Sequence, residues 1–452
     1  MERPTSSSVI FSLLLVFGLL LYAMMATSSE RIAFQLVIDD AIGPATEDYI
    51  VRSLDKATQQ QAELVVIRMD TPGGLDSAMR GIIKSITNSA VPVATYVAPT
   101  GSRAASAGTY ILYASHIAAM APGTNLGAAT PVKIGGLSPP DISGKDKKDK
   151  TEKSDPMQNK IINDAVAYIR GLAELHGRNQ DWAEKAVREA ASLQANEALK
   201  LNVIDIVATG MTDLFTQING RKIKLQGREH TIDTAGLTIR EMNPDWRSRL
   251  LSVITNPNIA YILMLMGIYG LILEFSNPGA IVPGTIGAIA LLLAMYSFQL
   301  LPINYAGMGL ILLGVALMVG EAYQPSFGML GIGGFVSFII GSIILMDTDV
   351  PGLGIDISVI ITFAISSALL FIFVVGMAIK ARRKPIVSGS EELIGSEAMV
   401  LQDFEQNGRV AVHGETWRAI CNEPLSSGQT VKVVGIKGLI LQVKPYVKTI
   451  EE

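Results

Sequence analysis

The strongest constraint on the fold of this 452-residue chain is a block of apolar sequence between residues 257 and 379. Only Glu274 and Glu321 carry a charge between residues 258 and 346. A soluble core does not supply so many apolar windows of about 20 residues, the length that a helix needs to cross a bilayer. Both glutamates lie near the ends of these windows, so we expect them to reach the membrane interface. The block predicts five membrane spans, near residues 258–276, 280–297, 304–322, 327–346 and 357–379.

A second apolar segment, residues 9–23, follows a short start that contains Arg3. This is the layout of a secretory signal. Residues 1–28 are therefore predicted to be a signal peptide or an uncleaved signal anchor, and either one exports the sequence that follows. Four basic residues come directly after the last span, which predicts a cytoplasmic location for that end: Lys380, Arg382, Arg383 and Lys384. Five spans then place the region before residue 257 outside the cytoplasm, in agreement with the export signal.

The region from residue 31 to about residue 120 alternates between strand-like and helix-like segments. Such alternation predicts a parallel α/β sheet, in which ligands usually bind at the carboxyl ends of the strands. We expect strands at residues 32–38, 64–69, 91–98 and 116–121, and helices at residues 45–61 and 75–87.

Two glycine-containing motifs fall at those carboxyl ends. Asp-Thr-Pro-Gly-Gly occupies residues 70–74, and Gly-Ser-Arg-Ala-Ala-Ser-Ala-Gly-Thr-Tyr occupies residues 101–110. We expect Ser106 at the start of a helix, where free N–H groups and the helix dipole stabilise a developing negative charge. The Gly73-Gly74 turn can offer a further N–H group. The pair of motifs therefore predicts a serine nucleophile with an oxyanion hole for acyl transfer.

A serine nucleophile needs a base, and two candidates are available. His116 is the only nearby histidine, but we expect it at the far end of the Ser106 helix, in a structural role. A lysine base works in the neutral form, which burial favours. Lys160 stands in the first turn of an amphipathic helix predicted at residues 157–176. The alternative for Lys160 is a surface ion pair with Asp164 at position i+4, which would keep it charged.

Three further segments have a distinct composition. Residues 133–156 are rich in lysine, glycine and proline, which predicts either a solvated loop or a lid over the site. Residues 222–233 have the pattern of a short hairpin. Residues 244–256 place apolar residues beside two arginines, which is typical of an interfacial helix, although an ordinary domain-terminal helix has the same pattern. Residues 390–450 contain five short strand patterns separated by turns, which predicts a small OB-like barrel.

Composition excludes several functions. The net charge of −4 gives no case for nucleic-acid binding, and the barrel lacks a basic strip with aromatic residues. The single cysteine, Cys421, excludes an intramolecular disulfide and a cysteine-rich metal site. The four histidines show no ligand spacing. We therefore expect no metal and no cofactor.

Four motifs in this order carry a resemblance to a known family. They are the motifs at residues 70–74 and 103–110, Ala-Met-Ala-Pro-Gly-Thr-Asn-Leu-Gly-Ala-Ala at residues 119–129, and Asn-Lys-Ile-Ile-Asn-Asp-Ala-Val-Ala-Tyr-Ile-Arg at residues 159–170. The chain resembles long-form members of the NfeD family, membrane-anchored relatives of ClpP-class serine proteases. The resemblance covers almost the whole chain. It implies a multidomain fold, with a ClpP/crotonase-like α/β domain at residues 30–235, an α-helical transmembrane region at residues 257–380 and a C-terminal all-β OB-like barrel.

The resemblance also implies roles for single residues. The serine of the Ala-Ser-Ala-Gly motif is the family's nucleophile, which corresponds to Ser106, and the lysine that opens the helix after the loop is its base, which corresponds to Lys160. Gly74 and Ala107, beside Gly73, take the positions that form the oxyanion hole. The implied activity is endopeptidase cleavage of apolar segments in membrane-associated proteins, notably stomatin-like partners. Pairing of subunits into at least a dimer is implied as well.

Two other functions compete with this hypothesis. A non-catalytic scaffold that organises stomatin-like proteins through its spans and barrel would tolerate replacement of Ser106 or Lys160. A ligand-binding relative is the other alternative, because the crotonase fold uses similar glycine turns to hold the oxyanions of acyl-CoA. An exported domain would rarely meet CoA, which counts against that alternative.

Overall fold

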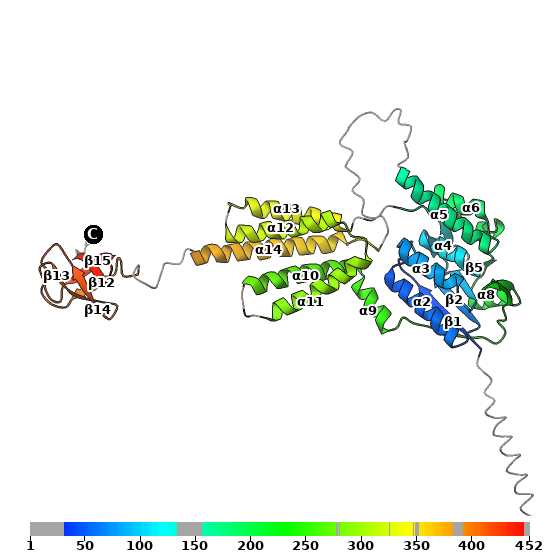
Figure 1. Ribbon diagram of the computed structural model, residues 1–452, viewed down its shortest axis with the longest axis horizontal. Helices are drawn as coiled ribbons and strands as arrows, with labels where there is room; N and C mark the ends of the chain where they lie inside the picture. Colours follow the sequence, from blue (N-terminus) through cyan, green and yellow to red (C-terminus); the bar gives the residue numbers. More distant parts are fainter. Residues whose placement is uncertain are drawn as a thin grey trace, which may run out of the picture. The chain divides into compact units, whose positions relative to one another are not determined.

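The chain forms an α/β domain, a group of apolar helices and a small β-barrel, which follow one another along the sequence (Figure 1). This computed structural model describes residues 31–132, 156–276, 279, 281–324, 326–346, 348, 352–382 and 392–446. The predicted export signal at residues 1–28 and nearly all of the predicted loop at residues 133–156 lie outside the described residues.

A six-stranded sheet forms the centre of the α/β domain, and every pair of neighbouring strands in it is parallel. The prediction of a parallel α/β sheet is therefore confirmed. β11 was not predicted, because its four residues are all exposed and show no apolar pattern. In spatial order, the strands are β11 (Thr238–Glu241), β1 (Ile32–Ile38), β2 (Leu64–Met69), β3 (Val93–Val97), β5 (Ile117–Met120) and β8 (Ile206–Val207).

The two faces of the sheet are covered by different layers. Side chains alternate along a strand, so Val65, Ile67 and Met69 of β2 enter one core while Leu64 and Val66 enter the other. The larger core is covered by α2 (Pro44–Gln59), α3 (Asp76–Thr87), α4 (Ala107–Ala114), α5 (Pro156–Leu175), α6 (Gln180–Arg188) and α7 (Ala195–Lys200). The smaller core is covered by α8 (Met211–Ile218) and by the predicted hairpin, β9 (Lys222–Leu225) and β10 (Arg228–Thr231).

Helix α4 is the most enclosed helix near the predicted nucleophile. All eight of its residues are buried, as expected of a helix that is apolar on every side. A side chain at Gly108 would place its Cβ atom 2.6 Å from Cγ2 of Thr71. The small residues after Ser106 are therefore required for α4 to pack against the loop that follows β2.

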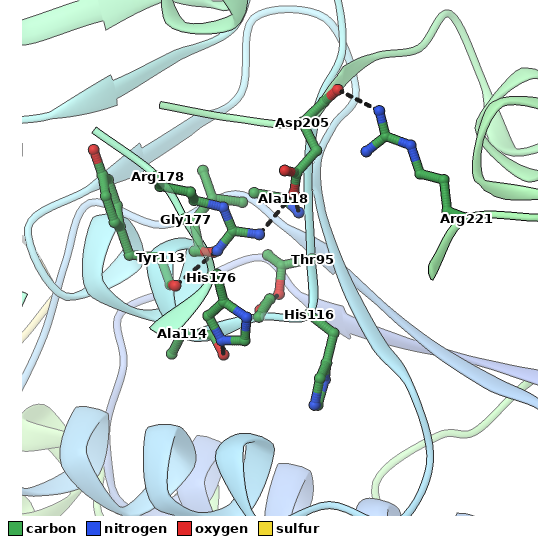
Figure 2. Close-up of polar contacts among 12 residues, drawn as sticks. Thr95, Tyr113, Ala114, His116, Ala118, His176, Gly177, Arg178, Asp205 and Arg221 are labelled. Carbon is green, nitrogen blue, oxygen red and sulfur yellow. Dashed lines mark hydrogen bonds and ion pairs between the residues drawn. The ribbon is translucent and has the colours of Figure 1, made fainter. Parts of the chain in front are cut away.

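The C-terminal end of α4 is held by a buried arginine (Figure 2). Arg178 donates hydrogen bonds to the carbonyl group of Tyr113 (2.7 Å) and to that of Leu112 (3.3 Å), which also accepts from the N–H group of Ser115 (3.3 Å). Its guanidinium group also pairs with Asp205 at 2.7 Å, and that carboxylate accepts a hydrogen bond from the N–H group of Ala118. These contacts join the end of α4 to β5 and to the start of β8.

Two histidines pack beside this arginine. The Nδ1 atom of His116 accepts a hydrogen bond from the N–H group of Val93, while Nε2 of His176 donates to the carbonyl of Ala114. Burial first, and then the charge of Arg178, lowers the pKa of His116 to about 4 and that of His176 to about 3. His116 therefore has the structural surroundings expected of it, beyond the C-terminal end of α4.

Five apolar helices follow the short helix α9 (Trp246–Ile254), close to the five predicted spans. Among the described residues, α10, α11 and α12 are long and apolar enough to cross a membrane, whereas α13 and the apolar part of α14 are shorter. The number of crossings therefore stays a prediction. The helices are α10 (Pro257–Ser276), α11 (Val282–Leu300), α12 (Tyr305–Tyr323), α13 (Met329–Leu345) and α14 (Ile357–Arg382).

Glycines allow α10 and α11 to approach closely. A Cβ atom at Gly270 would lie 2.9 Å from the Cα atom of Gly287, a contact that only small residues permit. Glu274 lies near the end of α10, as expected from the sequence. Its carboxylate accepts hydrogen bonds from the N–H groups of Ile281 (3.1 Å) and Gly284 (3.3 Å), and so caps the start of α11.

The C-terminal strands close into a barrel, as the sequence predicts. Its interior is filled by alternate side chains of the strands, among them Val410, Val431, Val433 and Leu441. The five strands are β12 (Glu397–Val400), β13 (Asn407–Val412), β14 (Glu415–Ile420), β15 (Thr430–Lys437) and β16 (Ile440–Pro445).

The lowered pKa values of His116 and His176 predict a loss of stability in mild acid. Between pH 6.5 and about 4 the unfolded chain binds protons that these two folded residues do not, so the free energy of unfolding falls as the pH falls. The fall is at most about 2.7 kcal/mol per pH unit for the two residues together. Denaturant unfolding of the full chain in detergent, measured from pH 7 to pH 4.5, tests this.

The matched variant combines His116→Asn with His176→Gln, which keep an acceptor near Val93 and a donor near Ala114. We expect a shallower dependence of stability on pH in the variant. Equal slopes for the two proteins would contradict the prediction.

Candidate functional site

The two glycine-containing motifs lie side by side at the carboxyl ends of two central strands of the sheet. β2 and β3 are neighbours, and Met69 pairs with Val97 near their carboxyl ends. Beyond those ends, the N–H group of Thr71 donates to the carbonyl of Arg103 (2.8 Å), and the N–H group of Ala105 donates to the carbonyl of Thr71 (3.1 Å). The loop before Ser106 contains a short strand, β4 (Arg103–Ala105), and these two hydrogen bonds join Thr71 to it.

Ser106 stands at the N-cap of α4, where the sequence places it. Its backbone has φ 50° and ψ −116°, a left-handed conformation that is unusual for a residue other than glycine. The N–H group of Ser106 donates to the carbonyl of Gly127 (2.9 Å), at the end of β6 (Asn125–Gly127), which runs parallel to β4. A strained turn between a strand and a buried helix, with a partly accessible serine, is typical of a nucleophile.

The side chain of Ser106 faces the glycine turn. A Cβ atom at Gly73 would lie 2.7 Å from Cβ of Ser106 and 3.2 Å from its Oγ atom. Gly73 also has φ +124°, which a side chain would strain. Only glycine therefore leaves room for the serine hydroxyl at this position.

The backbone N–H groups around Ser106 differ in their availability. The N–H group of Gly73 donates to Oγ1 of Thr71 (3.2 Å), so the role of Gly73 in the predicted oxyanion site is to provide space. No residue in the described part of the chain accepts a hydrogen bond from the N–H group of Gly74 or Ala107. Ala107 opens α4, where N–H groups have no partner within the helix. These two groups can bind an oxyanion next to Ser106.

Two threonines that the sequence analysis did not single out hold this geometry. The hydroxyl of Thr71 lies 3.1 Å from the carbonyl of Gly73 and accepts the hydrogen bond from its N–H group. The hydroxyl of Thr109 lies within hydrogen-bonding distance of the carbonyl groups of Ala104 (2.8 Å) and Gly127 (3.0 Å). Both threonines lie in the quoted motifs. Thr71 bonds within its own motif, and Thr109 bonds both to its own motif and to Gly127 of β6.

Lys160 lies in the first turns of α5, and its side chain is exposed. The predicted alternative, an ion pair with Asp164, is wrong, because Asp164 pairs with Arg80 of α3 at 2.7 Å. Planar guanidinium groups form such pairs with carboxylates better than lysine does. Within the described residues, no hydrogen bond joins Lys160 to Ser106.

Family comparisons cover each part of the chain. The NfeD1b N-terminal domain matches residues 33–226, the NfeD integral membrane domain matches residues 258–377, and the NfeD-like C-terminal, partner-binding domain matches residues 390–445. The membrane-bound protease PH1510 of Pyrococcus horikoshii is 36% identical over 446 residues, which are 95% of this chain and 97% of that protein. This chain belongs to the NfeD family. The resemblance seen in the sequence is thus confirmed, and the chain is a membrane protein.

Other relatives are more distant or shorter. The membrane protein NfeD1b of Bacillus subtilis is 25% identical over 452 residues, covering 95% of this chain and 96% of that protein. A lysine-to-alanine variant of the 1510-N membrane-bound stomatin-specific protease, solved with a substrate peptide, is 37% identical. It covers 50% of this chain and 98% of its own, with a TM-score of 0.42. A serine-to-alanine variant of the same protease is 36% identical, with coverage of 48% and 99% and a TM-score of 0.42.

Replacement of Gly73 by alanine should disturb Ser106 directly. The strain of a positive φ angle costs about 1 kcal/mol, and the contact with Ser106 adds about 1–3 kcal/mol. The control is Gly101→Ala, because Gly101 has φ +93° but no atom within 4 Å of the added Cβ. We expect Gly73→Ala to lower the free energy of unfolding more than Gly101→Ala does. Equal losses of unfolding free energy, measured by denaturant unfolding, would mean that a side chain at position 73 does not clash with Ser106.

Proposed function

We propose that this NfeD protein is a membrane-anchored serine endopeptidase with Ser106 as the nucleophile and Lys160 as the base. Its substrates are apolar segments of membrane-associated proteins such as stomatin-like partners. The observation that carries the proposal is the Ser106 turn, with its positive φ angle and two N–H groups free to bind an oxyanion. The 36% identity with a membrane-bound protease over nearly the whole chain supports it.

In the proposed reaction, Lys160 removes the hydroxyl proton of Ser106 while Oγ attacks the peptide carbonyl. The oxyanion of the tetrahedral intermediate accepts hydrogen bonds from the N–H groups of Gly74 and Ala107. The protonated lysine then gives its proton to the leaving amine, and an acyl-enzyme remains on Ser106. Water that is activated by the same lysine hydrolyses the ester and restores both residues.

Arg80 supports the placement of Lys160. Its guanidinium group bonds to Asp76 in the first turn of α3 (2.8 Å) and to Asp164 on α5 (2.7 Å), and lies 4.4 Å from the centre of the Tyr168 ring. Asp76 lies two residues after Gly74, and Asp164 lies one helical turn after Lys160. A single side chain thus joins the helix of the oxyanion turn to the helix of the base.

Helix α4 contacts the same group of side chains. Tyr168 stacks on Tyr110, with ring centroids 6.1 Å apart, and Tyr110 lies one turn after Ser106. Burial raises the pKa of Tyr110, and the charges of Asp76, Arg80 and Asp164 act on it as well. Helix α3 follows Gly74, α4 follows Ser106 and α5 carries Lys160, and these three helices meet around Arg80.

The exposure of Lys160 fits an enzyme whose substrate completes the site. A lysine base must be neutral, and removal of water from its amine favours the neutral form. An apolar peptide laid over the Ser106 turn would exclude that water. Pairing with a second copy of the chain, which we also propose, would add to the enclosure.

We further propose a multi-pass location in the cell membrane, with the α/β domain outside the cytoplasm and the barrel inside. The apolar helices and the basic residues after the last predicted span support this orientation. A reporter enzyme that is active only in the cytoplasm, fused after residue 452, should be active. An inactive but full-length fusion would reverse the orientation.

A non-catalytic scaffold for stomatin-like proteins is the second candidate function. The family description of residues 390–445 as a partner-binding domain favours it. A scaffold would retain partner binding after loss of Ser106 or Lys160 and would show no peptide cleavage at all. The cleavage experiment that follows distinguishes the two functions.

Replacement of either proposed catalytic residue should abolish cleavage. We expect Ser106→Ala and Lys160→Ala each to lower kcat by about 10³-fold or more, because neither proton transfer nor attack has a substitute group. The control is Lys185→Ala, which removes another exposed lysine, on α6. The assay uses the full chain and apolar peptides from the C-termini of stomatin-like proteins.

Each contrary result of this assay has a definite meaning. Cleavage that persists in Lys160→Ala would show that another residue is the base. Absence of cleavage by the intact, folded protein would favour the scaffold.

Loss of Arg80 should impair the chemistry more than the fold. Arg80→Met keeps roughly the length of the side chain but removes both ion pairs. Lys160 would then be less well placed relative to Ser106. We therefore expect kcat to fall about 10-fold with little change in KM. The control is Arg52→Met, which breaks a similar ion pair with Asp48 on α2. A pH–rate profile should also change for Arg80→Met alone. Equal effects of the two variants would give Arg80 a merely structural role.

A further inference from the structure

Helix α9 exposes a stripe of apolar side chains. Trp246, Leu250 and Val253 are 68%, 51% and 54% exposed. Residues on a helix advance by roughly 100° each, so these three positions fall on one face. Ser248 lies on the opposite face and is only 3% exposed. The apolar face of this helix is therefore its outward face, the reverse of the arrangement in an ordinary surface helix.

The buried face of α9 is fixed to the α/β domain. The hydroxyl of Ser248 donates to Asp48 of α2 (2.6 Å), and the carboxylate of Asp245 caps the helix by accepting from the N–H group of Ser248 (2.9 Å). These contacts orient the helix about its own axis. The stripe of Trp246, Leu250 and Val253 consequently points away from α2.

The C-terminal end of α9 lies beside the start of one apolar helix and the end of another. α9 ends at Ile254, and α10 begins at Pro257, three residues further on. The carbonyl of Ile254 also accepts a hydrogen bond from the hydroxyl of Ser297, near the end of α11 (2.8 Å). Since α10 and α11 are long enough to cross a membrane, the start of one and the end of the other mark one side of the bilayer.

Two arginines flank the stripe. Arg247 is about 90° from its centre on one side and Arg249 about 65° on the other. Both are exposed, and the guanidinium group of Arg247 lies 5.3 Å from the centre of the Trp246 ring. An apolar stripe between cationic side chains matches the boundary between acyl chains and phosphate groups. Tryptophan prefers the same boundary. The chemistry of α9 thus fits a lipid surface better than it fits water.

We infer that α9 lies in the membrane interface, on the side from which α10 enters the bilayer. Trp246, Leu250 and Val253 insert among the acyl chains, and Arg247 and Arg249 bind lipid phosphates. This proposal does not depend on the proposed protease activity. It does reach the candidate site, because α2 begins at Pro44, two residues after Ile42, whose N–H group donates to the carbonyl of Gly73 (2.7 Å). Anchoring of α9 would hold the glycine turn at a fixed height above the membrane.

The first test measures the depth of Trp246. The chain has three tryptophans, so the double variant Trp182→Phe, Trp417→Phe retains Trp246 alone. This full-length variant is reconstituted in vesicles of phosphatidylcholine with about one third phosphatidylglycerol. The phosphatidylglycerol supplies the negative surface charge that arginines bind. We expect blue-shifted emission and strong quenching by lipids brominated near the headgroup. Emission typical of water, without quenching, would overturn the proposal. Blue-shifted emission without quenching would also overturn it, and would indicate that a second copy of the chain covers the stripe.

The second test avoids changes to buried residues of the α/β domain. In a Cys421→Ser background, Leu250→Cys places a thiol in the stripe, and Ser252→Cys places one on an exposed position outside it. We expect a membrane-impermeant maleimide to label the second variant at least 10-fold faster than the first in vesicles that expose this side. Replacement of Arg247 and Arg249 by glutamine should bring the two labelling rates closer together in anionic vesicles. Equal labelling of the two thiols would refute insertion.

Discussion

The candidate site depends on the backbone pairing between Thr71 and the Arg103–Ala105 strand. This parallel pairing lies beyond the ends of β2 and β3 and has its own register, because Met69 is opposite Val97 whereas Thr71 is opposite Ala104. It brings the two small-residue motifs into contact. Without it, Gly73 would not lie against the side chain of Ser106, and the N–H groups of Gly74 and Ala107 would not belong to one site. Gly74 and Ser106 are 32 residues apart in sequence, so the tertiary fold has to bring the two motifs together.

The strained backbone of Ser106 is compensated by the helix that follows it. A residue other than glycine in such a conformation costs on the order of 1–3 kcal/mol. Helix α4 is buried along its whole length, and Arg178 binds the carbonyl groups at its far end. Removal of one partner from a buried ion pair such as Arg178–Asp205 typically costs about 3–5 kcal/mol. The fold therefore holds the nucleophile from both ends of a short helix.

Periodicity was sufficient to predict the parallel sheet, the main helices and the closed barrel, because in these elements the apolar pattern decides burial. It failed for β11, whose residues are all exposed, for β8, which has two residues, and for β4 and β6, which are only three residues long. It also suggested the wrong partner for Asp164. The local candidate was Lys160, four residues away, whereas the true partner, Arg80, is 84 residues away and is fixed by a second carboxylate and an aromatic ring.

The parts of the candidate site differ in how firmly the fold holds them. The proposed nucleophile Ser106 is fixed by backbone hydrogen bonds, whereas Lys160 is exposed. Helix α5, which carries Lys160, is joined to the rest of the site through Arg80, Tyr110 and the shared core. A serine without a neutral base nearby does not attack peptide bonds. An apolar segment that covers the turn would enclose the lysine, and removal of water from its amine favours the neutral form. On this reasoning, the same binding event would select apolar substrates and activate the serine, which suits a protease domain held beside a membrane.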